Sequence, residues 1–222
     1  MQKYIFVFSF LLMLSFSGLQ AQQKPKYSEY GLSAGNMIFT GQFTTDNSVG
    51  VWMKEQGGRF GLFTRRSLAP WFNIGVEANY GWFSLDDANH GRAQRGITVT
   101  TQVFNANVAA ELILLKYGKY HWANTFAPYF KLGAGGNFFS PNIENFGELD
   151  VQTEVYPYSY QSMNVFYGIG VKFRTSYKSS LAIEIVSHNS GARQMSGVIA
   201  NTINPRNDRY GGILIHYSVL IF

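Results

Sequence analysis

The chain has 222 residues, of which 46% are hydrophobic, 17% aromatic and 14% charged, with a formal net charge of +5. After residue 21 no stretch approaches the roughly 18 consecutive apolar residues of a membrane-spanning helix, which excludes a helical membrane protein. Long basic runs are absent, so the mild positive charge does not indicate a nucleic-acid partner. The lack of cysteine is typical of an oxidising compartment.

The first 21 residues have the order of a secretory signal peptide. Lys3 gives a positive start, an almost unbroken apolar run covers residues 4–16, and Ala21 supplies a small residue before the expected cleavage. An N-terminal membrane anchor is the alternative, but the run is short for a helical span, which needs about 20 apolar residues. We therefore expect a cleaved segment at residues 1–21 and a single domain at residues 22–222.

Eight segments of the remaining chain alternate apolar and polar side chains with a period of two, which predicts β-strands with two different faces. In chain order they are residues 30–39, 58–66, 72–82, 104–114, 129–138, 165–174, 181–188 and 210–222. The third is the clearest, because Val76 and Tyr80 share one face while Glu77 and Asn79 share the other. At about 3.3 Å per residue, a tilted strand of this length spans a bilayer core.

The connections between these segments alternate between short and long. The shorter ones follow the second, fourth and sixth strands, at residues 67–71, 117–128 and 175–180, and the longer polar ones are residues 40–57, 85–96, 139–164 and 189–209. Outer-membrane barrels have short periplasmic turns and long external loops. The pattern therefore predicts an all-β, eight-stranded antiparallel up-and-down transmembrane β-barrel. We place it in the outer membrane of a Gram-negative bacterium, with both chain ends in the periplasm.

The strand faces favour this barrel over a secreted β-sandwich or a lipocalin-like barrel. The apolar faces are nearly uncharged along their whole length and aromatic at their ends, as Trp71 and Trp82 are at the two ends of the third strand. A further aromatic cluster lies near the turn after the fourth strand: Tyr117, Tyr120, Trp122 and Phe126. Aromatic girdles mark the two membrane interfaces of such barrels. We therefore expect the apolar faces to contact outer-membrane lipid.

The polar faces are then expected to line the interior. They carry charges of both signs: Arg65, Glu77, Glu111, Lys131, Lys172, Arg174 and Glu184. Buried charges are costly unless they are paired, so we expect a network of ion pairs that fills the barrel and performs no catalysis. The interior of an eight-stranded barrel is just wide enough for side chains, which predicts no porin-like conductance.

The last strand ends in an aromatic residue, Phe222, as the targeting signal of outer-membrane barrels does. The more apolar face of this strand carries Ile213, Ile215, Tyr217, Val219 and Ile221. This face puts Phe222 on the opposite side from the usual arrangement. A β-bulge at Gly211 and Gly212 would change that register.

One segment carries an alternative, enzymatic interpretation. Residues 187–191 resemble the His-x-Ser-Asn segment of outer-membrane lipid A deacylases, with His188 and Ser190 as the catalytic pair and Asp208 as the acid that orients the histidine. Gly191 stands where that family carries asparagine. Strand parity puts His188 and Ser190 on the interior face unless a bulge reverses it. We therefore expect no catalytic residues, and the scattered histidines predict neither a metal site nor a cofactor.

Short segments spread over residues 28–222 share a pattern of glycine, aromatic and charged residues: 75–87, 92–96, 110–112, 127–129, 133–138, 168–172 and 204–208. In these segments the chain resembles the small outer-membrane barrels akin to PorG. Those barrels are accessory components of type IX secretion and gliding, within the broader OmpA/OmpX-like eight-stranded superfamily. The resemblance implies a non-enzymatic structural or accessory role in the cell envelope, with other envelope or secretion proteins as partners.

Overall fold

The computed structural model describes residues 27–41, 43–44, 48–91, 93–94, 96–115, 117, 125–144, 153–200 and 207–222. Its long strands are β1 (Ser28–Thr40), β2 (Gly57–Ala69), β3 (Phe72–Asp86), β4 (Thr98–Ile113), β5 (Phe126–Glu144), β7 (Tyr160–Arg174), β8 (Ser179–Ser190) and β10 (Arg209–Ile221). The shorter elements are helix α2 (Val49–Glu55), the 3-10 helix η2 (Asp87–His90), and strands β6 (Thr153–Val155) and β9 (Val198–Ala200). The expected signal peptide lies outside the described residues.

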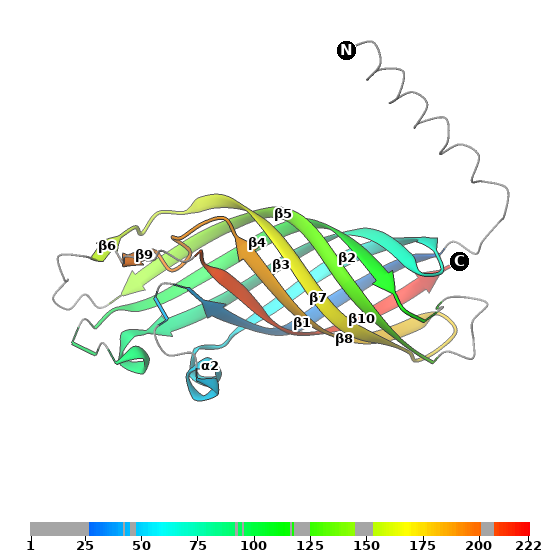
Figure 1. Cartoon of the computed structure of the whole chain (residues 1–222), viewed down its shortest axis with the longest axis horizontal. Helices are drawn as coiled ribbons and strands as arrows, with labels where there is room; N and C mark the ends of the chain where they lie inside the picture. Colours follow the sequence, from blue (N-terminus) through cyan, green and yellow to red (C-terminus); the bar gives the residue numbers. More distant parts are fainter. Residues whose placement is uncertain are drawn as a thin grey trace, which may run out of the picture.

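The eight long strands form one closed antiparallel barrel in the order β1-β10-β8-β7-β5-β4-β3-β2. The ring closes where β1 pairs with β10, with Ser28 opposite Ile221. The start of β1 and the end of β10 therefore lie at one end of the barrel, which we call the inner end, whereas α2 and the small β6–β9 sheet lie at the other, the outer end (Figure 1). Three connections at the outer end, residues 41–56, 145–159 and 191–208, are longer than any at the inner end, and in outer-membrane barrels the end with the long connections is extracellular.

All eight predicted strands are present, and the predicted fold class is confirmed. Several strands extend further toward the outer end than predicted. β3 continues to Asp86, β4 begins at Thr98, β5 continues to Glu144 and β7 begins at Tyr160. α2, β6 and β9 lie within connections that the sequence predicts to be loops.

The outward side chains form an apolar belt, as predicted from strand parity. On β4, for example, Phe104 and Val108 are exposed while Asn105 and Asn107 are buried. An arc of aromatic residues on β2 to β5, which we call the outer aromatic ring, bounds the belt toward the outer end. Phe60, Tyr80, Phe104 and Phe138 are successive cross-strand neighbours in it, and Trp82 lies beside them. Exposed aromatic residues also bound it toward the inner end: Trp71, Phe126, Phe173, Tyr177 and Tyr217. None of the described helices is long and apolar enough to cross a membrane.

One residue predicted for the aromatic girdle lies elsewhere. Tyr117 is only 2% exposed and its hydroxyl donates a 2.8 Å hydrogen bond to Ser180 Oγ, so it closes the inner end instead of facing lipid. Phe126 is exposed, as predicted. Tyr120 and Trp122 lie outside the described residues.

Beyond the outer aromatic ring, the polarity of the two strand faces reverses. On β3, Trp82 points outward, whereas the next residue, Phe83, is fully buried in the interior. The same reversal occurs at residues 103–104 of β4 and 138–139 of β5, which pair directly. The part of the barrel beyond the ring therefore has the polarity of a water-soluble β-protein, apolar inside and polar outside.

The register of the last strand is now defined. β10 pairs with β8 without interruption from Arg209 to Val219, so the strand has no bulge at its two glycines. Phe222 follows the end of β10, and its ring centroid lies 5.4 Å from that of Tyr177 and 5.9 Å from that of Tyr27. Its side chain is 38% exposed and belongs to the aromatic residues of the inner end.

Candidate functional site

The interior of the barrel is divided into layers along its axis, and β4 crosses all of them. From the inner to the outer end, the buried side chains of β4 are Ile113, Glu111, Ala109, Asn107, Asn105, Val103, Thr101 and Val99. The layers are an apolar inner plug, a charged layer, an asparagine layer and an apolar outer plug. Polar groups confined between apolar plugs must satisfy one another, because a buried polar group without a partner is costly.

The charged layer contains two groups of ion pairs. In the first, Lys172 Nζ lies 2.8 Å from Glu29 Oε2 and 2.8 Å from Glu111 Oε2. Arg65 contacts the same two carboxylates, with Nε 2.8 Å from Glu111 Oε1 and Nη1 3.4 Å from Glu29 Oε1. Ser218 donates a further 2.7 Å hydrogen bond to Glu29 Oε1. This group links five strands of the barrel: β1, β2, β4, β7 and β10.

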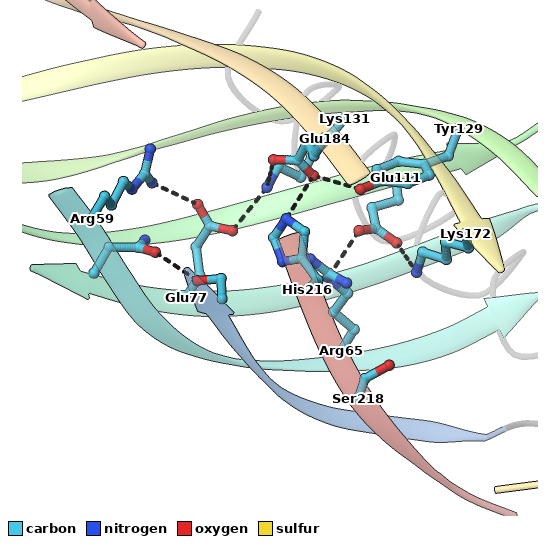
Figure 2. Close-up of polar contacts among 12 residues, drawn as sticks. Arg59, Arg65, Glu77, Glu111, Tyr129, Lys131, Lys172, Glu184, His216 and Ser218 are labelled. Carbon is cyan, nitrogen blue, oxygen red and sulfur yellow. Dashed lines mark hydrogen bonds and ion pairs between the residues drawn. The ribbon is translucent and has the colours of Figure 1, made fainter. Parts of the chain in front are cut away.

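The second group lies beside the first. Figure 2 shows Glu77 between two cations, with Lys131 Nζ 3.0 Å from Oε2 and Arg59 Nη2 4.0 Å from Oε1. Lys131 Nζ also lies 2.6 Å from Glu184 Oε1. Tyr129 donates a 2.7 Å hydrogen bond to Glu184 Oε2. Each carboxylate of this group is therefore charge-paired and hydrogen-bonded, which offsets part of its desolvation cost.

The structure brings together most of the charges predicted for the interior. The two groups contain Arg65, Glu77, Glu111, Lys131, Lys172 and Glu184. Arg174 differs, because it lies half-buried at the inner end with its guanidinium 5.0 Å from the centroid of the Tyr117 ring. Sequence reasoning missed Glu29 and Arg59, although Arg59 has the strand parity of Arg65. With these two included, four glutamates face four cations, so the layer is formally neutral.

A layer of buried asparagines lies between the charged layer and the outer plug. Its members are Asn79, Asn105, Asn107, Asn137 and Asn164. Asn164 Nδ2 donates to Asn107 Oδ1 at 3.0 Å and to Asn137 Oδ1 at 2.9 Å. Asn107 Nδ2 in turn donates to Asn105 Oδ1 at 2.8 Å. Strand parity predicts several of these residues on polar faces, but the links across strands depend on the register of pairing, which parity alone does not give.

His188, one of the two candidate catalytic residues, is fully buried in this polar part of the interior. Its ring stacks between those of Tyr210 and Phe166, at centroid distances of 4.5 and 4.7 Å. Arg59 Nη1 lies 3.0 Å from His188 Nε2, and since a guanidinium only donates, Nε2 is the acceptor. Nδ1 then carries the proton and donates to Asn164 Oδ1 at 3.2 Å. His188 therefore acts as a neutral packing group of the interior.

Ser190, the other candidate, is also fully buried and lies under the outer loops. Its hydroxyl donates to the backbone carbonyl of Asp208 at 3.0 Å and lies 3.0 Å from Met195 Sδ. The Asp208 carboxylate accepts a 2.9 Å hydrogen bond from the backbone N–H of Met195. The predicted parity of β8 is confirmed, since its pairing with both neighbours is unbroken and both candidate side chains face the interior, away from lipid.

Apolar clusters close the interior at both ends. The outer plug comprises Met37, Phe39, Phe43, Phe83, Leu85, Ile97, Val99, Val103, Phe139, Met195, Val198 and Tyr210. The inner plug comprises Tyr27, Ile113, Tyr117, Ala127, Tyr129, Ala182 and Leu220. Burial raises the pKa of Tyr117, so its hydroxyl stays protonated and holds its hydrogen bond to Ser180.

Side chains of the strands themselves fill this interior. The described residues contain no group of three or more histidine, aspartate or glutamate side chains placed to hold a metal ion. The charges neutralise one another, and apolar plugs separate them from water at both ends. A closed β-barrel with an outward apolar belt and a neutral, filled interior defines a small transmembrane barrel of the outer-membrane type.

Comparisons with known proteins agree with this class. A family model described as "Outer membrane protein beta-barrel domain" matches residues 8–210, and the chain belongs to this family of Gram-negative outer-membrane proteins. No curated protein matches the chain in sequence.

Among solved structures, Neisserial surface protein A is 9% identical, with a TM-score of 0.53 over 88% of this chain and 99% of its own. Ail, the attachment invasion locus protein of Yersinia pestis, is 9% identical, with a TM-score of 0.49 over 89% and 100%. The outer membrane enzyme PagL is 13% identical, with a TM-score of 0.39 over 86% and 98%. At these identities the likeness concerns the fold alone.

Proposed function

We propose that this chain is a non-enzymatic outer-membrane barrel with a structural or accessory role in the cell envelope. The observation that carries the proposal is the pairing of the interior charges, where four glutamates pair with four cations between two apolar plugs. A catalytic acid, base or nucleophile must be able to reach a substrate. The groups of this interior are instead committed to one another.

The outer end is the surface at which we propose contacts with other molecules. Glu55 of α2 fastens this helix to the chain after β3, because its Oε1 accepts 3.1 Å hydrogen bonds from Asp86 N and from Asn89 Nδ2. Its Oε2 lies 3.0 Å from His90 Nε2. Binding residues are commonly found on loops that a rigid scaffold positions. These contacts support a role for the outer end in holding partner proteins at the membrane.

The more specific role that we propose is accessory to type IX protein secretion. It rests on the resemblance to barrels akin to PorG, in segments such as residues 133–138 and 168–172. Both segments lie in the barrel wall, on β5 and β7, where they support the likeness of the scaffold. The partners themselves must be identified by experiment.

Purification of the tagged chain from native outer membranes in mild detergent tests this role. We expect envelope or secretion proteins to co-purify with the wild-type chain. Glu55→Ala should reduce their recovery, because it releases α2 from the η2 segment. Glu144→Gln, an exposed change at the same end of the barrel, is the matched control. Absence of secretion components from wild-type preparations would argue against the type IX role.

The alternative, a lipid A deacylase, predicts that the chain removes an acyl chain from lipid A, whereas the non-enzymatic proposal predicts that it does not. With His188 and Ser190 inside the barrel, we expect overexpression of the wild-type chain to leave the mass of lipid A unchanged. Loss of one acyl chain, abolished by Ser190→Ala, would replace the non-enzymatic proposal with an enzymatic one. Mass spectrometry of lipid A from the two strains distinguishes these outcomes.

A further inference from the structure

A patch of uncharged polar side chains covers the outer wall of the barrel just beyond the outer aromatic ring. We call it the outer-wall patch, and it consists of Ser84, Thr100, Gln102, Ser140 and Asn142. Its members are cross-strand neighbours on β3, β4 and β5, since Ser84 pairs with Thr100, which pairs with Asn142. Trp82 of the aromatic ring lies directly opposite Gln102, at the base of the patch.

The outer-wall patch faces away from the protein core. Ser140 is half-buried and the other members are exposed. Ser84 Oγ lies 3.3 Å from Thr100 Oγ1, and Gln102 Oε1 accepts a 3.0 Å hydrogen bond from the Tyr80 hydroxyl. The hydroxyl and amide groups therefore lie in rows along the sheet. The alternate residues of the same strands point inward and build the apolar outer plug, so the patch adds nothing to the core.

The wall that carries the patch is the tallest part of the barrel. β3, β4 and β5 have 15, 16 and 19 residues and the adjacent β7 has 15, whereas β1, β2 and β10 have 13 and β8 has 12. From Phe104 in the aromatic ring to Thr98, β4 rises by roughly 15 Å, at about 3.4 Å per residue and a tilt of about 40°. The extra height lies on one side of the barrel.

The aromatic ring identifies what surrounds this wall. Such rings mark the edge of the acyl chains. In the outer leaflet of a Gram-negative outer membrane, the glycolipid carries its sugars immediately above the acyl chains. The patch is continuous with the lipid-facing belt below it, and so stands at the height of those sugars.

We propose that the outer-wall patch binds the sugar headgroup of the outer-leaflet glycolipid. Hydroxyl and carboxamide side chains both donate and accept hydrogen bonds, which matches the hydroxyl groups of sugars. Trp82 adds an exposed aromatic surface at the base, where a sugar ring next to the acyl chains would rest. No member of the patch is cationic, and its neighbours in the next row, Asp86 and Glu144, are acidic. A surface selective for phosphate would carry Arg or Lys instead, so the recognised groups are sugars.

The test compares two ligands that share lipid A and differ in the core sugars that only one of them carries. The refolded barrel in detergent micelles is titrated with lipid A and with a lipopolysaccharide that ends after its inner-core sugars, and native mass spectrometry gives both dissociation constants. We expect the wild-type chain to bind the ligand with core sugars more tightly. Thr100→Val combined with Gln102→Leu should reduce that preference by roughly tenfold, as expected for the loss of one or two hydrogen bonds.

A second patch variant and a control outside the patch complete the experiment. Asn142→Leu removes an amide from the neighbouring strand, and it should lower the preference even if the double variant refolds poorly. Thr125→Val changes an exposed threonine at the inner end and should leave the preference unchanged. Equal wild-type affinity for both ligands, or a preference that survives the patch variants, would overturn the proposal. Equal affinity for the free core oligosaccharide would also overturn it, since the recognised sugar would then be a soluble glycan.

Discussion

Glycines face aromatic rings across neighbouring strands inside the barrel. Three such pairs occur in the described residues: Gly31 with Phe63, Gly133 with Phe166, and Gly170 with Tyr129. In each pair the aromatic ring occupies the space that a Cβ atom would need if another residue replaced the glycine. A ring laid across the neighbouring strand fills the narrow interior and shields the glycine backbone. Glycine on an interior face is thus part of the packing, although it has no side chain.

We expect Gly133→Ala to destabilise the barrel by about 1–3 kcal/mol, the usual cost of overpacking. A Cβ atom at Gly133 would lie 2.3 Å from Phe166 Cζ and 2.4 Å from the carbonyl oxygen of Val108, which cannot move freely. Gly136→Ala is the matched control on the same strand, because its Cβ would meet nothing within 4 Å. Urea unfolding in lipid vesicles gives both free energies, and similar values for the two variants would contradict this packing.

The charged layer predicts that the same substitution changes the free energy of unfolding more inside the barrel than at its exposed end. Glu111→Gln should lower the free energy of unfolding by about 3–5 kcal/mol, because it leaves Arg65 and Lys172 short of a buried carboxylate. Glu144→Gln makes the same chemical change at the exposed end of β5, where its effect should be within about 0.5 kcal/mol. Unfolding midpoints that coincide would show that the interior charges are not energetically coupled.

At the scale of single strands, the sequence predicts the membrane-spanning parts well and their outer extensions poorly. Alternation identifies all eight strands because lipid outside and paired charges inside keep one polarity pattern through the bilayer. At Trp82 and Phe83, two consecutive apolar residues mark the point where this pattern reverses. A reversal of phase within a continuous strand has the same sequence signature as a strand end. The predicted boundary at residue 82 therefore lies at the edge of the membrane, not at the end of β3.

The partners of the charged layer were beyond prediction for a different reason. Glu29 lies on β1 and Lys172 on β7, which are not adjacent in the barrel, so their ion pair crosses the interior. Such a contact depends on how far neighbouring strands are staggered, and period-two patterning carries no information on stagger. Parity correctly predicts which face Lys172 occupies, but it cannot choose the carboxylates beside it.

The reversal of polarity along β4 can be tested by placing the same charge at two heights. Val108 and Thr100 both face outward on this strand, Val108 in the middle of the apolar belt and Thr100 beyond the aromatic ring. Val108→Arg should impair folding by about 2–4 kcal/mol, the cost of a cation near the bilayer midplane. Thr100→Arg should be tolerated, because its side chain lies outside the acyl chains. Refolding yields in lipid vesicles compare the two, and equal impairment would place Thr100 within the bilayer.

At the scale of the whole molecule, side chains fill the barrel along its axis, and we therefore do not expect it to act as a channel. Apolar plugs lie at both ends, and the charged and asparagine layers fill the space between them. Hydrated ions would have to displace paired side chains and cross the plugs, which is energetically unfavourable.

We therefore expect planar-bilayer recordings of the refolded chain to show no stable conductance on the nanosiemens scale. A porin reconstituted in the same way provides the positive control. A steady large conductance of the wild-type barrel would mean that the interior side chains rearrange readily in a membrane.

The wide sequence separation within the charged layer has a consequence for the order of assembly. Glu29 pairs with Lys172, 143 residues later in the chain, and accepts a hydrogen bond from Ser218, 189 residues later. Until β7 arrives, Glu29 and Glu111 share Arg65 as their ion-pair partner and lack the contacts from Lys172. Contacts so distant in sequence form late and slow the folding of a chain. The hydrogen bond from Ser218 on β10 to Glu29 on β1 forms only when the ring closes, so a sheet that is still open when it meets the bilayer is disfavoured against the finished barrel.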